Sequence, residues 1–349
     1  MTERRPRILV DARKARDFGI GTYIRGLLGG LAGLDRYELH ALVLPGEEGF
    51  LPSGVTARVC AARHYSLGEL VAVRRAIGAL RPDVFHAPHY VVPFFPPRAT
   101  VVTIHDLMHL TRPEHAARAK RAYARWMVGR ALRLSARVIA GSEETKKEIF
   151  AFGHARGGKV VVIGYGVRGD FLEGEEKKEE KGAPYLLFLG NDKPHKNLDG
   201  LLAAWPRVRA ANPSLSLVLA GVSVGRTLPE GATALGWVPD ADLPALVAGA
   251  RILVQPSFAE GFGLPVIEAQ AAGTPVACSD IPALRAAAGE AAVFFDPHSA
   301  ASIADALNML LGDEEKRGFL RKRGRERAAA FTWRAVAERT AAVYESVWL

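Results

Sequence analysis

Two glutamates frame the segment with the clearest chemical meaning, Glu260-Gly-Phe-Gly-Leu-Pro-Val-Ile-Glu268. Pro265 suits the first turn of a helix, which leaves Glu260 in the loop before the helix and Glu268 about one turn inside it. Carboxylates accept hydrogen bonds from sugar hydroxyls, and glycine N–H groups at a helix N-terminus bind phosphate. The segment therefore predicts a binding site for a sugar and its phosphate. The alternative is a Glu268 that only balances the helix dipole.

A second loop with phosphate-binding chemistry contains Lys193, His195 and Lys196. It follows a predicted strand and precedes a predicted helix, for which Asn197 is a suitable cap. The positive end of that helix and an ammonium group would act on the same anion. The loop is a candidate diphosphate site, although solvated loop lysines would give the same pattern.

The first half of the chain offers glycines and histidines near predicted strand ends. Gly19-Ile-Gly21 lets backbone N–H groups approach a bound group, or forms a plain tight turn. His105 follows a buried strand and could donate to a sugar hydroxyl or orient an acceptor. His86 and His89 form a similar pair, and satisfied structural histidines are the alternative at both places.

An Asp-x-Asp pair and the histidines raise the question of a metal site. Asp240 and Asp242 open a predicted helix over 242–250, where Asp is a natural cap and dipole partner. The histidines have no metal-binding spacing. We therefore expect no bound metal and no other cofactor.

Short apolar runs alternate with helical patterns along the chain, which predicts parallel sheets with crossover helices. In the first half the expected strands are 7–10, 38–44, 83–86, 100–104, 137–140 and 160–163. In the second half they are 185–189, 216–220, 232–235, 252–255, 275–277 and 292–295. The candidate residues follow these strands, at the edge where open α/β sheets bind ligands.

A charged stretch separates the two halves. Residues 173–181 are almost all Glu, Lys and Gly, a composition typical of a solvated linker. We expect one Rossmann-like domain over 1–172, a linker over 173–183 and a second Rossmann-like domain over 184–330. Residues 331–349 predict a last helix that could pack back on the N-terminal domain.

The 349-residue chain is 49% apolar and carries a formal net charge of +9, with its basic excess in the first half. This asymmetry favours an anionic partner there. Cys60 and Cys278 make no disulfide framework and are expected as buried thiols. The sequence shows no signal-peptide pattern and no apolar run of about 18 residues, so we expect a soluble, cytoplasmic protein.

The basic excess has a local source in residues 115–137. Arg118, Arg121 and Arg125 fall on one helical face, with Trp126 among them. A basic helix with aromatics can lie on an anionic membrane or meet a lipid-diphosphate acceptor. A solvated arginine-rich face is the alternative.

These segments resemble those of the family 4 glycosyltransferases over essentially the full length. The matching segments are Gly19-Ile-Gly-Thr-Tyr, Thr103-Ile-His-Asp-Leu, Lys193-Pro-His-Lys-Asn, Gly236-Trp-Val-Pro-Asp and the run from Glu260 to Glu268. The resemblance implies the GT-B fold, in which two Rossmann-like, doubly wound parallel-sheet domains face each other across a cleft. It also implies a nucleoside-diphosphate-sugar donor on the C-terminal domain, an acceptor on the N-terminal side, and retention at the anomeric carbon.

The resemblance implies a role for each matching position in the second half. Glu268 would hold the donor ribose, Glu260 would contact the transferred sugar, and Lys196 would bind the diphosphate. The backbone around Trp237 and Val238 would meet the base. Backbone contacts to the sugar and diphosphate would come from Gly261, Phe262, Gly263 and Leu264.

In the first half, the resemblance places His105 near the reacting centre and Gly19 and Gly21 on the cleft floor. His105, Lys196 and Glu260 are thus the expected catalytic residues. Without a metal, Lys196 and a helix N-terminus would stabilise the leaving diphosphate. We expect a same-face mechanism in which that phosphate takes the acceptor proton.

The chain departs from the family pattern at the phosphate site. Many members carry an arginine where Asn191 stands, and commonly an arginine where His195 stands. Both changes remove a bidentate cation. Lys193 is the candidate substitute, and Asn191 stays among the expected donor-binding residues.

The His105 segment and the Pro-x-Lys-Asn loop look most like mannosyltransferases that use GDP-mannose, with UDP-sugars second. The acceptor would be a hydroxyl of a glycan, a lipid-linked sugar or a small molecule. Two other classes stay open: a sugar-nucleotide epimerase or phosphorylase, and a non-catalytic nucleotide-binding module. Nucleic acid is not expected, because cleft carboxylates repel a phosphate backbone.

Overall fold

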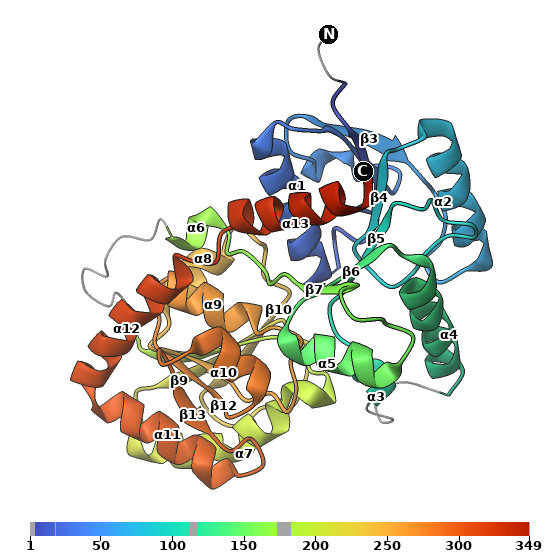
Figure 1. Ribbon diagram of the computed structural model, residues 1–349. Helices are drawn as coiled ribbons and strands as arrows, with labels where there is room; N and C mark the ends of the chain where they lie inside the picture. The colour runs from blue at the N-terminus through green and yellow to red at the C-terminus, as the bar shows by residue number, and fades with distance from the viewer. Residues whose placement is uncertain (1–3, 18, 112–117, 173–182, 349) are drawn as a thin grey trace. The chain divides into compact units, whose positions relative to one another are not determined.

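The computed structural model describes residues 4–17, 19–111, 118–172 and 183–348 (Figure 1). The chain forms two compact units, of which the first combines Met1–Gly166 with Thr332–Leu349 and the second is Val167–Phe331. The boundary between the units, after Gly166, lies upstream of the charged linker that the sequence predicts at 173–183. Most of that stretch, 173–182, lies outside the described residues.

The first unit is built on a parallel sheet of seven strands in the order β3-β2-β1-β4-β5-β6-β7. The strands are β1 (Arg7–Asp11), β2 (Glu38–Val43), β3 (Val55–Val59), β4 (Val84–Ala87), β5 (Thr100–Ile104), β6 (Arg137–Ala140) and β7 (Val160–Val162). The strand order reverses between β1 and β4. Such a switch point is where open α/β sheets bind ligands, at the carboxyl ends of the strands.

The C-terminal helix completes the first unit. The helices of the first unit are α1 (Ile20–Leu34), α2 (Leu67–Leu80), α3 (Met108–Thr111), α4 (Arg118–Leu134), α5 (Glu143–Phe152) and α13 (Trp333–Trp348), with a 3-10 turn at Glu48–Phe50. α13 packs along α1 (Figure 1), and Gly26 permits the close approach, because a Cβ there would lie 2.0 Å from the Trp333 ring. The Tyr344 hydroxyl is also hydrogen-bonded to Nδ1 of the buried His86, at 2.7 Å.

The second unit is built on a parallel sheet of six strands in the order β10-β9-β8-β11-β12-β13. The strands are β8 (Tyr185–Leu189), β9 (Ser216–Ala220), β10 (Ala232–Gly236), β11 (Ile252–Gln255), β12 (Val276–Ser279) and β13 (Val293–Phe295). Its helices are α6 (Gly169–Leu172), α7 (Leu198–Ala211), α8 (Leu243–Gly249), α9 (Leu264–Ala271), α10 (Pro282–Ala288), α11 (Ala300–Gly312) and α12 (Glu314–Ala328), with a 3-10 turn at Pro194–Lys196. The switch point of this sheet lies between β8 and β11.

Both faces of the second sheet are covered by apolar cores. Leu186 and Phe188 belong to one cluster of buried residues, whereas Leu187 belongs to another. Successive side chains of a strand point to opposite faces, so the two clusters lie on the two sides of the sheet.

Every strand predicted from the sequence is present, with bounds that differ by a residue or two. The sequence pattern does not predict β3, an edge strand whose side chains are mostly exposed and which lacks a buried apolar run. Within the described residues, no helix has the length and apolarity that crossing a bilayer requires.

Candidate functional site

The second unit brings Lys196 and Glu260 together at its switch point. Lys196 ends the 3-10 turn after β8, and Glu260 lies in the loop after β11. The ammonium donates to both carboxylate oxygens, at 2.8 Å to Oε1 and 3.0 Å to Oε2. Both side chains are largely buried. Two motifs that stand 64 residues apart in the sequence thus form one buried ion pair.

Glu260 is held as a carboxylate. Ser257 Oγ and Gln255 Nε2 also donate to Oε1, at 2.6 and 2.7 Å. Burial on its own would raise the pKa of Glu260, but the charge of Lys196 and the hydrogen bonds together hold that pKa below its ordinary value. Because Oε1 already accepts three hydrogen bonds, an incoming hydroxyl would use Oε2 or displace a protein donor.

Asn197 ties together the loops that carry this pair. Its Oδ1 accepts from the Gly200 N–H at 3.2 Å and so caps α7, as the sequence predicts. Its Nδ2 donates to the carbonyls of Pro256 and Pro297, at 2.9 and 2.7 Å. These carbonyls lie in the loops after β11 and β13, so one buried amide fixes three strand-end loops.

The glycine-rich loop ends at the N-terminus of α9. Gly263 is the N-cap residue at φ 96°, a conformation that strains any residue with a Cβ. A Cβ there would also lie 2.8 Å from Leu284. Pro265 stands in the first turn as predicted, and Phe262 packs edge-on against Phe331 with 6.1 Å between ring centroids. The first N–H groups of α9, at Leu264 and beyond, thus start just after Gly261 and Glu260 in the chain.

Glu268 lies one turn inside α9, as predicted, and is only 7% exposed. Burial raises the pKa of its carboxyl to about 8, with the Arg168 charge opposing that rise and Asp170 and Asp240 adding to it. In the part of the chain that the structure describes, no group donates a hydrogen bond to this carboxyl.

Arg168 is a functional candidate that the sequence analysis missed. Its guanidinium donates to the Asp240 carbonyl at 2.6 Å and pairs with the Asp170 carboxylate, also at 2.6 Å. It thereby joins the loop after β10 to α6, and its charge offsets part of the rise in the pKa of the nearby Glu268 carboxyl. A lone arginine next to the charged stretch gives no sequence signal, because its partner Asp240 is 72 residues away.

The loop after β10 presents Trp237, which is 68% exposed, while Val238 packs against the core below it. Asp242 occupies the N-cap position of α8, as predicted, but its side chain makes no capping hydrogen bond. Asp240 instead lies against Arg168. The capping explanation for this pair is therefore right about position and wrong about the bond.

Asn191 and Lys193 lie at the start of the loop after β8. The Asn191 side chain accepts from the Lys193 N–H at 3.3 Å, which shapes the turn. Lys193 itself is exposed, whereas Lys196 is largely buried. Of the two lysines predicted for the phosphate, only Lys196 reaches Glu260.

In the first unit, His105 is buried and held at both ring nitrogens. Nδ1 is hydrogen-bonded to the Tyr165 hydroxyl, and Nε2 to the Pro88 carbonyl at 2.9 Å. The carbonyl can only accept, so Nε2 carries the proton. Burial lowers the pKa of His105 despite that bond and the nearby Asp106 charge, which keeps the ring neutral.

The other first-unit candidates each have a structural role as well. His86 is fully buried between Tyr344 and Thr103, and burial lowers its pKa to about 3. Gly21 lies inside α1, where a Cβ would come within 2.4 Å of the Ala15 carbonyl oxygen. Gly19 is the N-cap residue of α1 at φ 61°. Within the described ranges, no group of three or more His, Cys, Asp or Glu side chains is placed to hold a metal ion.

Two family models match consecutive parts of the chain. The model "Glycosyltransferase Family 4" matches residues 19–171, and the model "Glycosyl transferases group 1" matches residues 170–327. Together they extend over both units.

Relatives with mannosyltransferase names match most of the chain. The O-antigen chain mannosyltransferase B of Escherichia coli is 29% identical over 300 residues, which is 79% of this chain and 78% of the relative. The phosphatidyl-myo-inositol mannosyltransferase of Propionibacterium freudenreichii subsp. shermanii is 27% identical over 357 residues, 95% of this chain and 92% of the relative.

Solved glycosyltransferase structures share the fold at low identity. A sucrose-phosphate synthase of Thermosynechococcus elongatus superposes with a TM-score of 0.78 at 20% identity, covering 99% of both chains. WaaG, a glycosyltransferase involved in lipopolysaccharide biosynthesis, gives a TM-score of 0.78 at 13% identity, covering 97% of this chain and 99% of that one. The chain is therefore a family 4 glycosyltransferase with the GT-B fold, similar to mannosyltransferases.

Proposed function

We propose that the protein is a retaining mannosyltransferase whose donor is a nucleoside-diphosphate mannose, with GDP-mannose the first candidate. The observation that carries this proposal is the buried pair of Lys196 and Glu260 at the second switch point, followed by a helix, α9, that carries Glu268. A buried cation suits a diphosphate, and two carboxylates suit hydroxyls. The two mannosyltransferase relatives support mannose as the sugar.

In this proposal the donor is held at three places in the second unit. Glu268 takes the ribose hydroxyls and the backbone around Trp237 and Val238 meets the base. Lys196 and the N-terminus of α9 hold the diphosphate, and Glu260 takes a hydroxyl of the transferred sugar. Lys193 and Asn191 complete the phosphate site in place of the family arginine.

The chemical step is proposed to occur on one face of the sugar. The bond between the anomeric carbon and the phosphate oxygen breaks while the acceptor oxygen bonds to the same face of that carbon. The leaving phosphate oxygen takes the acceptor proton, and Lys196 stabilises the negative charge that develops. A covalent sugar trapped on Glu260, or on any other carboxylate, would contradict this mechanism.

The family resemblance assigns His105 to the transferred sugar, and the proposal keeps that role. Because burial lowers the pKa of His105, its ring is a weak base, which suits a hydrogen bond to a hydroxyl better than proton abstraction from it. Because both ring nitrogens are engaged, contact through nitrogen requires giving up the bond to Tyr165 or to Pro88.

A thermal-shift panel tests the donor assignment. A ligand that binds only the folded chain raises its melting temperature in proportion to the logarithm of its concentration over Kd. We expect the largest shift with GDP-mannose, and a shift with GDP that Glu268→Ala removes. A larger shift with UDP-glucose, which is bound in the solved structure of Anabaena HepE, would move the donor to the uridine class.

The acceptor is proposed to be a hydroxyl of a glycan or lipid-linked sugar, met by a first unit that can lie on an anionic membrane. α4 exposes Arg118, Lys120 and Arg125 together with Trp126. Cations next to an exposed indole fit the boundary between headgroups and acyl chains of an anionic bilayer. The first part of the predicted segment, 115–117, lies outside the described residues.

Vesicle co-sedimentation tests the membrane contact. We expect binding to vesicles with anionic lipid, little binding to neutral vesicles, and loss of binding in an Arg118→Glu, Arg125→Glu variant. Equal binding to neutral and anionic vesicles, or no binding to either, would leave α4 as a solvated face.

A further inference from the structure

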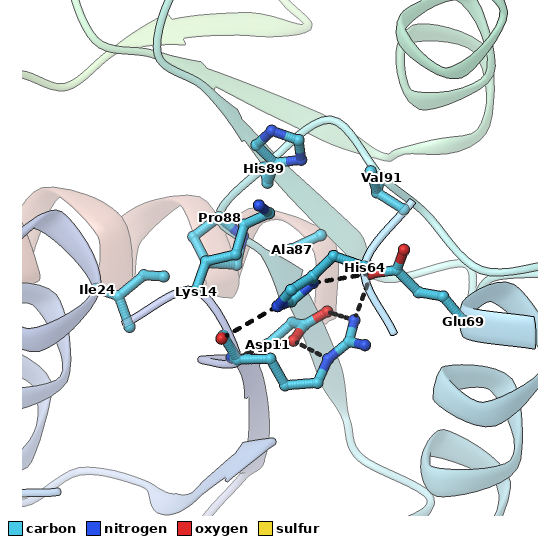
Figure 2. A pocket seen from close by; sticks show the side chains of 10 residues that line it. Asp11, Lys14, Ile24, His64, Glu69, Ala87, Pro88, His89 and Val91 are labelled. Atoms are coloured by element: carbon cyan, nitrogen blue, oxygen red, sulfur yellow. Dashed lines mark hydrogen bonds and ion pairs between the residues drawn. The ribbon is translucent and has the colours of Figure 1, made fainter. Parts of the chain in front are cut away.

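The two switch points differ in what holds their surroundings in place. At the first, charged side chains pair with one another: Arg13 donates to Asp11 at 2.7 Å and to Glu69 at 2.9 Å (Figure 2). The space that these side chains leave has room for about one water molecule. The first switch point is therefore held by its own ion pairs, whereas loops near the second are held by residues next to the unit boundary.

The chain passes between the units twice, and a hydrogen bond joins the two passages. The first lies between Gly166 and Val167, and the second between Phe331 and Thr332. Just inside the second unit, the Val167 N–H donates to the Phe331 carbonyl at 2.8 Å. The two chain ends of the second unit are thus fixed to each other. Each of them places a side chain against a loop of the proposed donor site.

At one of these ends, Phe331 packs against the glycine-rich loop. Its ring meets the Phe262 ring edge-on, with 6.1 Å between centroids and 70° between planes. Phe262 stands between Gly261 and Gly263, and glycines leave a backbone free to adopt many conformations. The ring contact therefore restricts a stretch of backbone that its own residues do not restrict.

Arg327 connects Phe331 to a second wall of the same loop. Its guanidinium lies over the Phe331 ring, 5.5 Å from the centroid, and its Nε donates to the Ala287 carbonyl of α10 at 2.5 Å. α10 also lies against Gly263, because a Cβ there would come within 2.8 Å of Leu284 and 3.2 Å of Ala287. The loop is thus held from two sides, and one arginine joins the two.

At the other end, Arg168 follows Val167 and reaches the loop after β10. Its guanidinium donates to the Asp240 carbonyl at 2.6 Å and lies over the Phe171 ring of α6, 5.1 Å from the centroid. Asp240 stands two residues after Val238, whose backbone we propose to meet the base. Arg168 therefore holds the base side of the proposed site, as Phe331 holds its sugar side.

We propose that Phe331 and Arg168 are positioning residues for the donor site. Phe331 sets the loop that meets the sugar and diphosphate, and Arg168 sets the loop that meets the base. The inference rests on the proposed function, since it takes the donor to bind these two loops. It adds that each residue acts on a different part of the donor, without contacting the donor itself.

Amide hydrogen exchange of the full chain without nucleotide tests whether Phe331 holds the loop. Exchange of loop amides follows local opening, which the ring contact opposes. We expect the amides of Gly261 to Gly263 to exchange about tenfold faster in Phe331→Leu and at the parent rate in Phe331→Tyr, which keeps the ring.

Phe294→Leu is the matched control for the exchange experiment. Phe294 packs on the same apolar cluster as Phe331 and also lies beneath an arginine, with Arg285 at 4.5 Å from its centroid. Unchanged loop exchange in Phe331→Leu, or equal acceleration in Phe294→Leu, would overturn the proposal. Should Phe331→Leu not fold, Phe262→Leu removes the same ring contact from the loop side.

Calorimetry with GDP-mannose, GDP and UDP tests which part of the donor each residue affects. In Phe331→Leu, the affinity ratio of GDP-mannose to GDP should fall about tenfold, because only GDP-mannose carries the sugar, and the ratio of GDP to UDP should stay unchanged. In Arg168→Met, the ratio of GDP to UDP should fall about tenfold, and the ratio of GDP-mannose to GDP should stay unchanged. If UDP-glucose is the better donor, UDP-glucose and UDP replace the first pair.

The two ratios separate positioning from a general loss of stability. A merely structural role would weaken all three ligands alike and leave both ratios at the parent values, which would overturn the inference while the donor proposal stands. The same holds if both variants change the same ratio. If no nucleotide binds the parent, the donor proposal fails, and the exchange rates still decide whether Phe331 holds the loop.

Discussion

At the scale of single residues, the proposed donor site contains charged groups that differ in how many hydrogen bonds the protein already makes to them. Lys196 and Glu260 neutralise each other, whereas Glu268 has no hydrogen-bond donor among the described residues. A bound sugar nucleotide therefore has to compete with the hydrogen bonds between Lys196 and Glu260. The same molecule could form a hydrogen bond with the Glu268 carboxyl without breaking one from a described residue.

Lys196→Ala should mainly lower turnover. The ammonium stabilises charge that develops as the sugar–phosphate bond breaks, and removal of one such group typically costs about 10²- to 10³-fold in kcat. The measurement is kcat and donor Kd for Lys196→Ala beside Lys196→Arg, which keeps the charge, at a temperature where both stay folded. A Kd that rises while kcat stays unchanged would assign Lys196 to ground-state binding only.

The variant should also lose stability, because it leaves Glu260 buried without its partner. Breaking a buried pair from one side costs about 3–5 kcal/mol. Lys196→Met combined with Glu260→Gln should recover part of that loss, as measured by denaturant unfolding. No recovery would mean that the pair does not carry the cost.

Glu268 should release a proton when the donor binds. With a pKa of about 8, its carboxyl is mostly protonated near pH 7, whereas the ribose hydroxyls favour the ionised acceptor. Donor affinity should therefore rise as the pH increases toward 8. Calorimetry in buffers of different ionisation enthalpy should show close to one proton released per donor bound, and none in Glu268→Gln.

The raised pKa of Glu268 also determines whether the stability of the fold rises or falls with pH. A raised pKa means that ionising Glu268 disfavours the folded state. Its contribution to stability is present below the ordinary pKa of about 4.5 and is lost as the pH rises through about 8. The parent should thus lose stability relative to Glu268→Gln over that range. Parallel unfolding free energies for the two proteins would contradict the assignment.

At the scale of elements, the strand-end loops of the second unit depend on Asn197. Asn197→Ala removes the α7 cap and leaves the Pro256 and Pro297 carbonyls without a donor, which should cost about 2–4 kcal/mol. Asn197→Asp keeps the cap acceptor but loses the donors, so it separates the two effects. Equal unfolding free energies for the alanine and aspartate variants would show that the cap contributes little.

The same scale shows why the sequence predicts some parts of the site better than others. Local sequence patterns predict β8 and β11, which are buried apolar runs, and the start of α9, which has a proline in its first turn and a glycine at its N-cap. Arg168 and its contact with Asp240 carry no local signal, because only the folded chain brings them together. β3 is missed for another reason: its side chains are mostly exposed at the sheet edge.

Burial explains the difference for the ionisable groups. The spacing of Glu260 and Glu268 predicts their places in loop and helix but not their charge states. One carboxyl has its pKa lowered by Lys196, and the other has its pKa raised by burial. Those opposite shifts depend on neighbours that the sequence pattern does not identify.

At the scale of the whole molecule, the chain returns to its starting unit. α13 follows the second unit in sequence but packs on α1 of the first, and Tyr344 reaches the buried His86. The first unit therefore cannot complete its packing without a helix that follows the second unit in the sequence. Two neighbouring glycines of α1 differ in whether this helix covers them, which gives a matched test.

Gly26→Ala should destabilise the first unit, and Gly29→Ala should stabilise it. A Cβ at Gly26 would collide with the Trp333 ring, and overpacking typically costs about 1–3 kcal/mol. Gly29 is exposed with nothing within 4 Å of an added Cβ, so alanine there adds helix propensity worth about 0.5–1 kcal/mol. Denaturant unfolding of the two variants measures the opposite signs, while donor binding, which we propose for the second unit, should be unchanged in both. If Gly26→Ala were as stable as Gly29→Ala, α13 would not be held against α1 in solution.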